Sequence, residues 1–537
     1  MRIPGNIDVL VVGAGPTGLM LANQLGRRDV RTLIIDRNAG PSVRTKALGV
    51  QARTLEIYSH LGIAERALEL GTRATGATLW AEGRRAAHVP LGDIGRDLSP
   101  YPFLLILGQD DNERLLGEIL RARGNDVLWN TELVGMAQRT DHVLATLQRA
   151  DGSTFEVTAV WVAGCDGARS AVRSLSGIAF PGAPYEHVFY VADTRTTGTM
   201  AAGELNVYLL RNGFHLFFPM RGPDHWRVVG IVPPHLRGRD DLDFDAVVPS
   251  IRDEVNASLS FRECSWFSTY RIHHRRAGRF RAGRCFLLGD AAHIHSPVGA
   301  QGMNTGLQDA YNLAWKLALV VSGQASDRLL DSYEAERIPV AKRLLDTTDR
   351  GFSLAVSDRW PTGWVRERIF PKLLSLAMRR DRTRTLAFRT ISQIGIRYPG
   401  SPLSETENGL PEGAPRAGDR FPWLRLRFGP DSPAEDLFAK LDDIRFHLIV
   451  FGQPSASFRL TEFDGLVVTH MIPDDPANDR QLVLTRVPKP SFYLLRPDGH
   501  VGLAGLCPDN DALTRYMEER LTLRSERSRP DLHRKVA

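Results

Sequence analysis

Cysteine is scarce in this chain of 537 residues. The four cysteines, Cys165, Cys264, Cys285 and Cys507, are widely spaced, and no two of them form a C-x-x-C pair. This spacing argues against a dithiol reductase and against a framework of disulfides. We therefore expect reduced thiols in a cytoplasmic protein.

Long hydrophobic runs and clustered charge are also missing. No stretch of eighteen or more apolar residues occurs, and the N-terminus lacks the segments of a signal peptide, so we expect no membrane span and no export. The net charge is +6, but the basic residues are dispersed among acids. We expect neither a nucleic-acid nor a membrane partner. Only the arginine-rich segment 271–284 could attract an anionic substrate or the phosphates of a nicotinamide cofactor.

Several catalytic signatures are absent. The chain has no G-x-S-x-G nucleophile motif and no P-loop. His273-His274 and His293-x-His295 have no carboxylate or thiol set at suitable spacing, so we expect structural histidines and no metal. The chain has one G-x-G-x-x-G motif and not two, which argues against a dedicated second domain for a nicotinamide cofactor.

That one motif is Gly13-Ala14-Gly15-Pro16-Thr17-Gly18, which follows an apolar strand at 7–12 and opens a helix at 19–26. The first glycine makes the turn, the second lets a pyrophosphate approach, and the third allows helix and strand to pack. Asp36 ends the next strand, where an acid bonds an adenosine ribose. This βαβ unit predicts a dinucleotide held at a helix N-terminus.

A second glycine-rich segment, Gly289 to Gly306, follows the apolar run 285–288 and precedes a helical pattern from Leu307. Its backbone can approach a ligand closely, and Asp290 can accept a ligand hydroxyl. The segment suits a large, flat, polyhydroxylated cofactor. Asp166-Gly167, with Arg173 beyond it, follows a further short strand; alone it is a common turn, but its position also fits a second wall of the cofactor site.

The remaining pattern indicates an α/β (α+β) chain of several domains. Helical periodicity covers 54–70, 112–123 and 371–396. Strands dominate 75–107 and 181–270, with a meander predicted at 206–210, 214–219 and 226–232. A segment rich in Pro and Gly, 401–420, is predicted to be a linker before a smaller αβ domain at 421–537.

The three motifs, in this order and at these separations, resemble the class A FAD-dependent aromatic hydroxylases, which have the para-hydroxybenzoate hydroxylase fold. Gly13 to Gly18 is similar to the family's ADP-binding motif, Asp166-Gly167 with Arg173 to its DG motif, and Gly289-Asp290 to its GD motif. The resemblance implies a discontinuous Rossmann-like FAD-binding domain, 1–180 with 271–400, and an inserted mixed β-sheet substrate domain, 75–107 with 181–270.

The length of the chain is most similar to that of the phenol and polyketide hydroxylase subgroup, which includes relatives of 3-(3-hydroxyphenyl)propionate hydroxylase, pentachlorophenol monooxygenase and rifampicin monooxygenase. The resemblance implies that 421–537 is a thioredoxin-like domain, here without C-x-x-C and therefore structural or dimer-supporting. A homodimer is thus one expected assembly.

The resemblance also implies the residues that bind FAD. They are Gly13, Gly15, Pro16, Thr17, Gly18, Asp36, Arg37, Arg44, Gln109, Asp166, Asp290, Pro297, Gly299, Gly302, Met303 and Asn304. Two positions depart from the family pattern. Ala300 occupies a glycine position of the family's P-P-x-G-G-Q-G loop and adds a methyl group near the flavin path, and Asp36 replaces the more usual Glu.

The implied activity is that of a monooxygenase. NADPH or NADH reduces FAD, O₂ adds to give a flavin C4a-hydroperoxide, and an oxygen atom passes to a phenolic or polycyclic aromatic compound. The protein must exclude water, orient the ring and help deprotonate the phenol. Arg211, His215 and Tyr270, all on the predicted sheet domain, are weak candidates for that base.

Other functions stay open at this point. A Baeyer–Villiger or epoxidising monooxygenase has no distinguishing motif, and a flavin-binding protein without catalysis is a further alternative. A flavin-dependent halogenase is disfavoured because the chain has no W-x-W-x-I-P stretch.

Overall fold

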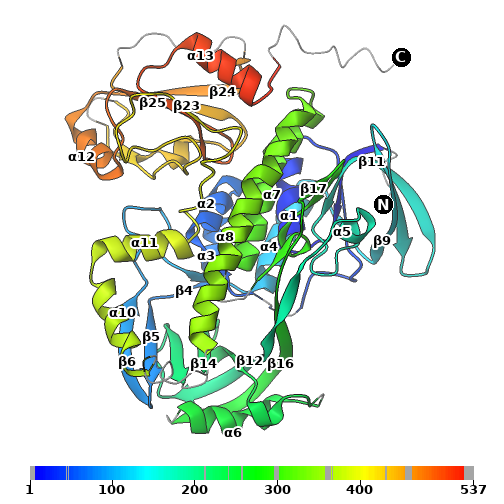
Figure 1. Cartoon of the computed structure of the whole chain (residues 1–537), viewed down its shortest axis with the longest axis vertical. Helices are drawn as coiled ribbons and strands as arrows, with labels where there is room; N and C mark the ends of the chain where they lie inside the picture. Colours follow the sequence, from blue (N-terminus) through cyan, green and yellow to red (C-terminus); the bar gives the residue numbers. More distant parts are fainter. Residues whose placement is uncertain are drawn as a thin grey trace.

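Three β-sheets form the framework of this computed structural model, which describes residues 6–43, 45, 47–210, 213–239, 241–255, 258–295, 301–356, 365, 367–429, 432–453 and 463–524. Figure 1 shows a C-terminal domain at one end, a twisted sheet at the other, and the N-terminal sheet with its helices between them. Within the described residues, no helix is long and apolar enough to cross a membrane.

The first sheet has the strand order β17-β18-β11-β1-β2-β8, with β9 and β10 beyond β11. Its core is a run of neighbouring parallel strands in which β1 pairs with β2 and β11, and β11 pairs with β18. Parallel neighbours place their carboxyl ends at one edge of the sheet. The strands are β1 (Asn6–Val12), β2 (Thr32–Ile35), β8 (Val127–Leu128), β9 (Thr131–Gln138), β10 (Val143–Arg149), β11 (Thr154–Gly164), β17 (Arg281–Ala282) and β18 (Cys285–Leu287).

Helices cover this sheet and a small sheet of β3 (Gly49–Val50), β7 (Leu105–Ile106) and β4 (Thr72–Arg73). The predicted single helix at 54–70 is in fact two, because Gly62 adopts φ +76° and ends the first of them. The helices are α1 (Pro16–Gly26), α2 (Ala52–Leu61), α3 (Ala64–Leu70), α4 (Gln109–Ala122), α5 (Ala171–Leu175), α7 (Gly302–Val321) and α8 (Asp331–Val356).

The second sheet corresponds to the predicted substrate domain and is called the substrate sheet below; it has the order β19-β16-β12-β15-β14-β13-β5-β6. The predicted meander is confirmed, because β13, β14 and β15 pair antiparallel in sequence. The strands are β5 (Gly76–Ala81), β6 (Arg84–Pro90), β12 (Gly182–Gly198), β13 (Leu205–Leu210), β14 (Gly213–Pro219), β15 (His225–Ile231), β16 (Leu259–Arg276) and β19 (His293–Ile294). Helix α6 (Phe244–Val255) packs on one face of this sheet. We call the opposite face, which carries Phe189, Phe214 and Ile231, the inner face.

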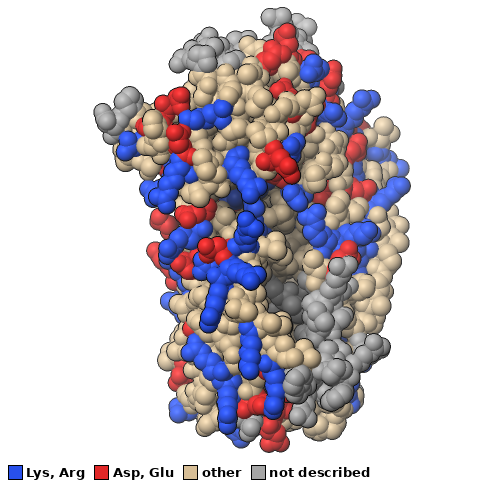
Figure 2. Space-filling view, turned by 60° about the vertical axis from the view of Figure 1, so that its left-hand side comes forward, with Lys and Arg blue, Asp and Glu red and all other residues tan. Residues whose placement is uncertain are grey.

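Two further helices, α10 (Phe370–Met378) and α11 (Asp381–Ile391), lie beside the β5–β6 edge of the substrate sheet. They replace the one helix predicted at 371–396, since Arg380 has an extended backbone between them. Figure 2 turns this side of the molecule forward and shows Lys and Arg side chains gathered on it.

The C-terminal domain has the mixed sheet β20-β26-β25-β23-β24. The segment predicted as a linker is not a free connection. Its residues Glu405–Thr406 form β20 and pair with β26, and Arg420 binds the buried carboxylate of Glu56 in α2. The other elements are β21 (Arg425–Leu426), β22 (Glu435–Asp436), β23 (Phe446–Phe451), β24 (Val467–Ile472), α12 (Pro476–Thr485), β25 (Ser491–Leu495), β26 (Val501–Gly505) and α13 (Asn510–Arg515).

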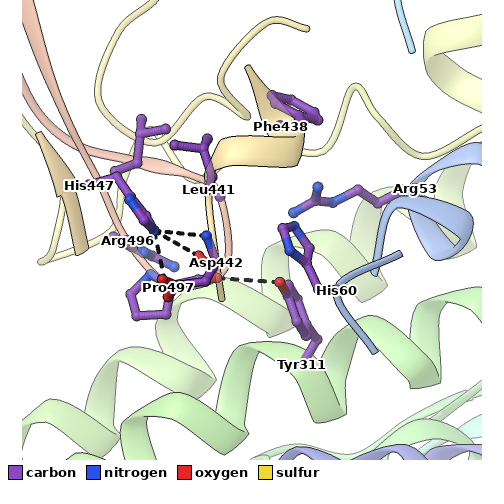
Figure 3. Close-up of a pocket in the computed structure, with 11 residues that line it drawn as sticks. Arg53, His60, Tyr311, Phe438, Leu441, Asp442, His447, Arg496 and Pro497 are labelled. Atoms are coloured by element: carbon purple, nitrogen blue, oxygen red, sulfur yellow. Dashed lines mark hydrogen bonds and ion pairs between the residues drawn. The ribbon is translucent and has the colours of Figure 1, made fainter. Parts of the chain in front are cut away.

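Buried ion pairs join the C-terminal domain to the helices beneath it. Arg496 binds Glu336 of α8 at 2.5 Å, and Lys316 of α7 binds the same carboxylate at 2.7 Å, with all three side chains fully buried. A small hollow lies beside this network, lined by paired side chains such as Arg53, Arg496 and His447 (Figure 3). Its lining includes none of the residues predicted to bind FAD.

Candidate functional site

The three sequence motifs meet at one edge of the first sheet. The Gly13 loop follows β1, Asp36 follows β2, Asp166 follows β11, and Gly289 follows β18, and these are neighbouring parallel strands. The carboxyl edge of such a sheet is where open α/β proteins bind ligands. Segments separated by more than 270 residues therefore build one site.

The glycines of the first motif have different tasks. Gly13 has φ +101°, and a Cβ there would lie 2.4 Å from the carbonyl oxygen of Cys165, while a Cβ on Gly18 would lie 1.9 Å from the oxygen of Gly13. A Cβ on Gly15 would meet nothing within 4 Å, and Gly15 caps α1 without a side-chain hydrogen bond. The first N–H groups of α1 thus face an open cradle that fits a pyrophosphate.

Asp36 is held against this cradle. Its Oδ2 accepts the backbone N–H of Ala14 at 2.7 Å, and its Oδ1 accepts the backbone and side-chain N–H groups of Asn38, both at 2.8 Å. The carboxylate is therefore oriented before any ligand arrives. The next residue, Arg37, is exposed and lies 4.0 Å from Glu132.

Asp166 offers an unsatisfied buried acceptor. Its Oδ2 accepts the N–H groups of Ala171 and Val172, but its Oδ1 is buried and bonds to none of the described residues. Burial raises the pKa of this carboxyl. Buried polar atoms are normally hydrogen-bonded, so this orphan atom fits a ligand donor at the sheet edge. Arg173 fastens the same loop to the third motif by donating to the carbonyl oxygens of Ala168 and Ala291.

The third motif is clamped by a carboxylate that the motif analysis missed. Asp309 of α7 accepts the N–H of Gly289 at 3.0 Å, His293 Nε2–H at 2.8 Å and Arg337 Nε–H at 2.6 Å. Burial works to raise the pKa of Asp309, but Arg337 and His293 outweigh it and hold that pKa below its ordinary value. The available signal was a single acid, Asp309, within the mostly apolar helix α7. Asp290 itself is exposed at the site.

The N-terminus of α7 contains Gly302, Met303 and Asn304. The side chain of Asn304 accepts from the backbone N–H of Gln51 and the hydroxyl of Thr54, and donates to the oxygen of Gly49. That amide therefore anchors α7 to α2 and β3, which leaves the backbone of this turn to face a cofactor. Met303 Sδ lies 3.4 Å from Asn112 Nδ2.

The other predicted cofactor residues are placed as follows. Gln109 opens α4 and donates to Glu113 at 2.8 Å. Thr17 lies in the first turn of α1, where a Cβ added at Gly289 or Gly306 would strike its hydroxyl. Arg44, Pro297, Gly299 and the departure at Ala300 lie outside the described residues.

The inner face of the substrate sheet is joined to this site by one arginine. Arg227 is 2% exposed, and its Nε and Nη2 donate to the two carboxylate oxygens of Asp193, both at 2.6 Å. Its Nη1 donates to the carbonyl oxygen of Thr45 at 2.6 Å. Thr45 follows Arg44, which the resemblance implies binds FAD, so this hydrogen bond ties the inner face to a segment expected near the cofactor.

Two of the residues predicted as candidate bases lie on opposite faces of the substrate sheet. Tyr270 lies on the inner face with its ring 6.0 Å from that of Phe189, and burial raises its pKa to about 12. His215 lies on the opposite face, where its nitrogens bond to Tyr190 and to Glu254 of α6. A position beneath α6 does not support a role for His215 at an inner-face substrate. Arg211 lies outside the described residues.

Known proteins match this sequence and this fold. The family described as "FAD binding domain" matches residues 6–348. The 6-methylpretetramide 4-monooxygenase of Streptomyces rimosus is 33% identical over 95% of this chain and 93% of its own length, and a rifampicin monooxygenase of Streptomyces venezuelae is 33% identical over 93% and 95%. The structure of an anhydrotetracycline hydroxylase of Streptomyces rimosus superposes with a TM-score of 0.76 at 28% identity, covering 96% and 99% of the two chains.

These matches cover both the cofactor edge and the inserted sheet, and they confirm the family that the three motifs predicted. FAD is therefore the cofactor of this chain. The chain belongs to the FAD-binding class A aromatic monooxygenases and is an FAD-dependent aromatic hydroxylase.

Proposed function

We propose that this enzyme uses NADPH or NADH and O₂ to hydroxylate a phenolic or polycyclic aromatic compound bound against the inner face of the substrate sheet. The observation that carries the proposal is the aromatic character of the inner face, where Phe189 and Phe214 are buried and Tyr270 is half-buried. Arg227 joins this face to the chain at Thr45. Two of the relatives that align over more than nine-tenths of this chain are named for 6-methylpretetramide and rifampicin, which favours a large substrate.

We assign the parts of FAD to the residues that fit them. The pyrophosphate would lie over Gly15 and the N-terminus of α1, and the adenosine ribose would bond to Asp36. The unsatisfied Oδ1 of Asp166 would accept from the cofactor, and the exposed Asp290 would bond the ribityl chain. Bound FAD would supply the redox chemistry that activates O₂. The remaining assignments stay predictions; they are Gly13, Pro16, Thr17, Gly18, Arg37, Arg44, Gln109, Pro297, Gly299, Gly302, Met303 and Asn304.

The chain's own part in the reaction is orientation and exclusion of water. The inner face would pack the aromatic rings of the substrate and keep solvent from the reacting edge. Burial raises the pKa of the Tyr270 hydroxyl to about 12, so the side chain of Tyr270 is protonated at neutral pH. It would therefore donate a hydrogen bond to the substrate instead of acting as the base that deprotonates it.

The C-terminal domain would have a supporting role. We propose a thioredoxin-like fold from its five-stranded mixed sheet, with a structural function because the chain has no C-x-x-C. The domain limits proposed are 1–180 with 271–400, 75–107 with 181–270, and 421–537, with 401–420 packed onto the last of these. A homodimer stays a prediction.

The test uses the FAD-loaded enzyme with NADPH or NADH, a series of monocyclic and polycyclic phenols, and O₂. We expect polycyclic phenols to stimulate nicotinamide oxidation and to gain one oxygen atom by mass spectrometry, with little peroxide. No stimulation by any phenol would contradict the proposal, and a lactone or epoxide product would replace hydroxylation with the Baeyer–Villiger or epoxidising alternative.

A further inference from the structure

Helices α10 and α11 expose large apolar side chains. Leu373 is 59% exposed, Leu376 57% and Leu386 68%, with Phe370 close behind at 45%. Six of the thirteen exposed large hydrophobic residues in the described part of the chain lie between 365 and 391. Exposed apolar groups scattered singly need no explanation, but a concentration of them marks an interaction surface.

These exposed residues are not needed for packing within the chain. A different set, Leu374, Met378 and Ala387, packs α10 and α11 on the β5–β6 edge of the substrate sheet, and Phe388 is buried against α2 and Ile394. Each helix therefore has one apolar face that is buried and further apolar residues that point outward. The outward residues are therefore free to contact a partner outside the chain.

The segment that contains these helices is also strongly basic. Residues 365–391 contain eight basic and two acidic residues, a net charge of +6, which equals the net charge of all 537 residues. Arg368 pairs with Glu82 and Arg384 with Asp381. Among the described residues, no carboxylate pairs with the other exposed basic side chains, which are Lys372, Arg379, Arg380, Arg382 and Arg389. Figure 2 shows this side of the molecule with its crowded basic side chains.

This charge selects the partner. A second copy packed across a two-fold axis would place one basic surface against another, which like-charge repulsion disfavours. Leucine and phenylalanine set between arginines on short amphipathic helices are typical of segments that lie in the interface of an anionic membrane. We propose that α10 and α11 form an interfacial anchor that docks the enzyme on an anionic lipid surface.

The proposal changes the expectation drawn from the sequence, which was no membrane partner. Basic residues dispersed over the whole chain concealed one segment with an excess of them. Because α10 packs at the edge of the substrate sheet, docking would bring that sheet to the bilayer, where apolar aromatic compounds partition.

The test is co-sedimentation of the FAD-loaded full chain with vesicles, either of phosphatidylcholine alone or of equal phosphatidylglycerol and phosphatidylcholine. We expect binding to the anionic vesicles only, weakened by salt. L373S/L376S/L386S should lower the partition coefficient about tenfold or more, because the apolar residues insert. R379E/R380E/R382E should lower it by about fivefold or more for each charge changed.

The matched control is V483S/L484S, which removes two equally exposed apolar residues from α12, at 76% and 59%, and should leave binding unchanged. Flavin absorbance and thermal unfolding check that each variant is folded. Failure to bind anionic vesicles at low salt overturns the proposal. The proposal is also overturned if salt abolishes binding and L373S/L376S/L386S still binds as well as the unchanged protein. That result would indicate that the basic surface binds a polyanion or an acidic protein. A dimer that L373S/L376S/L386S dissociates, with no lipid binding, would identify a second copy as the occupant.

Discussion

The cofactor edge and the inner face of the substrate sheet are both fastened by a buried arginine–aspartate pair, but the two pairs hold different things. Arg337 and Asp309 lock the Gly289 motif to α7 and α8 within one domain. Arg227 and Asp193 instead hold the loop at Thr45 against another sheet. On the proposed assignment, the first pair would fix the cofactor site in place, and the second would set how that site meets the substrate.

The surroundings of the two pairs differ as well. The cofactor edge is built from backbone N–H groups, glycines and three carboxylates, which suit any FAD. The inner face is built from apolar and aromatic side chains such as Phe189 and Tyr270, which can vary without altering the backbone. This contrast explains how one family keeps its cofactor and accepts many aromatic substrates.

Removing the clamp of the cofactor edge should have the largest effect. Arg337→Met leaves the carboxylate of Asp309 buried and short of its main cation, which we expect to cost about 3–5 kcal/mol of unfolding free energy and most of the bound FAD. Urea unfolding and flavin absorbance measure both. Arg66→Met, which breaks an exposed pair with Glu69, should cost less than about 1 kcal/mol. Equal losses in the two variants would show that the clamp has no special role.

The same clamp has a pH dependence with a defined sign. The pKa of Asp309 is lowered in the folded chain, so its stabilisation is present above the ordinary carboxyl pKa of 3.8 and is lost as the pH falls below it. Arg337→Met should remove that part of the acid sensitivity.

Two neighbouring glycines separate folding from binding. Gly13→Ala places a methyl group 2.4 Å from the oxygen of Cys165 at a φ of +101°, which should cost roughly 3 kcal/mol of stability. Gly15→Ala meets no atom within 4 Å, so the protein should keep its unfolding midpoint while its FAD affinity falls. Unfolding curves and FAD titration of the apoprotein distinguish the two. Destabilisation by Gly15→Ala equal to that by Gly13→Ala would contradict the open cradle.

The sequence predicted the local motifs and missed the contacts that join them. The Gly13 motif, Asp36 and the Gly289 motif are each readable because their chemistry lies within a few residues of a strand end. The bond from Arg227 to Thr45 spans 182 residues, and no periodicity encodes it. His215 and Tyr270 looked equivalent in the sequence because the face of a strand residue depends on register, which strand pairing sets.

Weakening the second pair should disturb coupling more than folding. Arg227→Lys keeps the charge, but a lysine cannot make the two-pronged contact with Asp193 and also reach Thr45. We therefore expect kcat/KM to fall about tenfold, which corresponds to about 1.5 kcal/mol. FAD content should stay normal while peroxide release per nicotinamide oxidised increases. The control is Arg281→Lys, at a surface pair with Asp331. It should leave kcat/KM and the peroxide released per nicotinamide oxidised unchanged. Unaltered coupling in Arg227→Lys would mean that the Thr45 loop is positioned by other contacts.

The smallest effect tests the inner face alone. Tyr270→Phe removes one hydroxyl from a half-buried apolar face. It should raise KM for a phenolic substrate by about fivefold or less, which corresponds to about 1 kcal/mol, since a single neutral hydrogen bond is lost. Because the pKa of Tyr270 is about 12, the phenol stays protonated at ordinary pH, and the pH profile of kcat between 6 and 9 should keep its shape.

The matched control for that change is on the other face of the same sheet. Tyr190→Phe removes a hydroxyl that bonds His215 beneath α6, and it should lower stability without altering KM. If Tyr270→Phe shifts the pH profile, this tyrosine ionises during turnover and acts as the base. A hydroxyl group affects KM directly only if it contacts the bound substrate. If Tyr190→Phe changes KM and Tyr270→Phe does not, the substrate therefore lies on the face of the sheet that α6 covers, and the proposed position on the inner face is wrong.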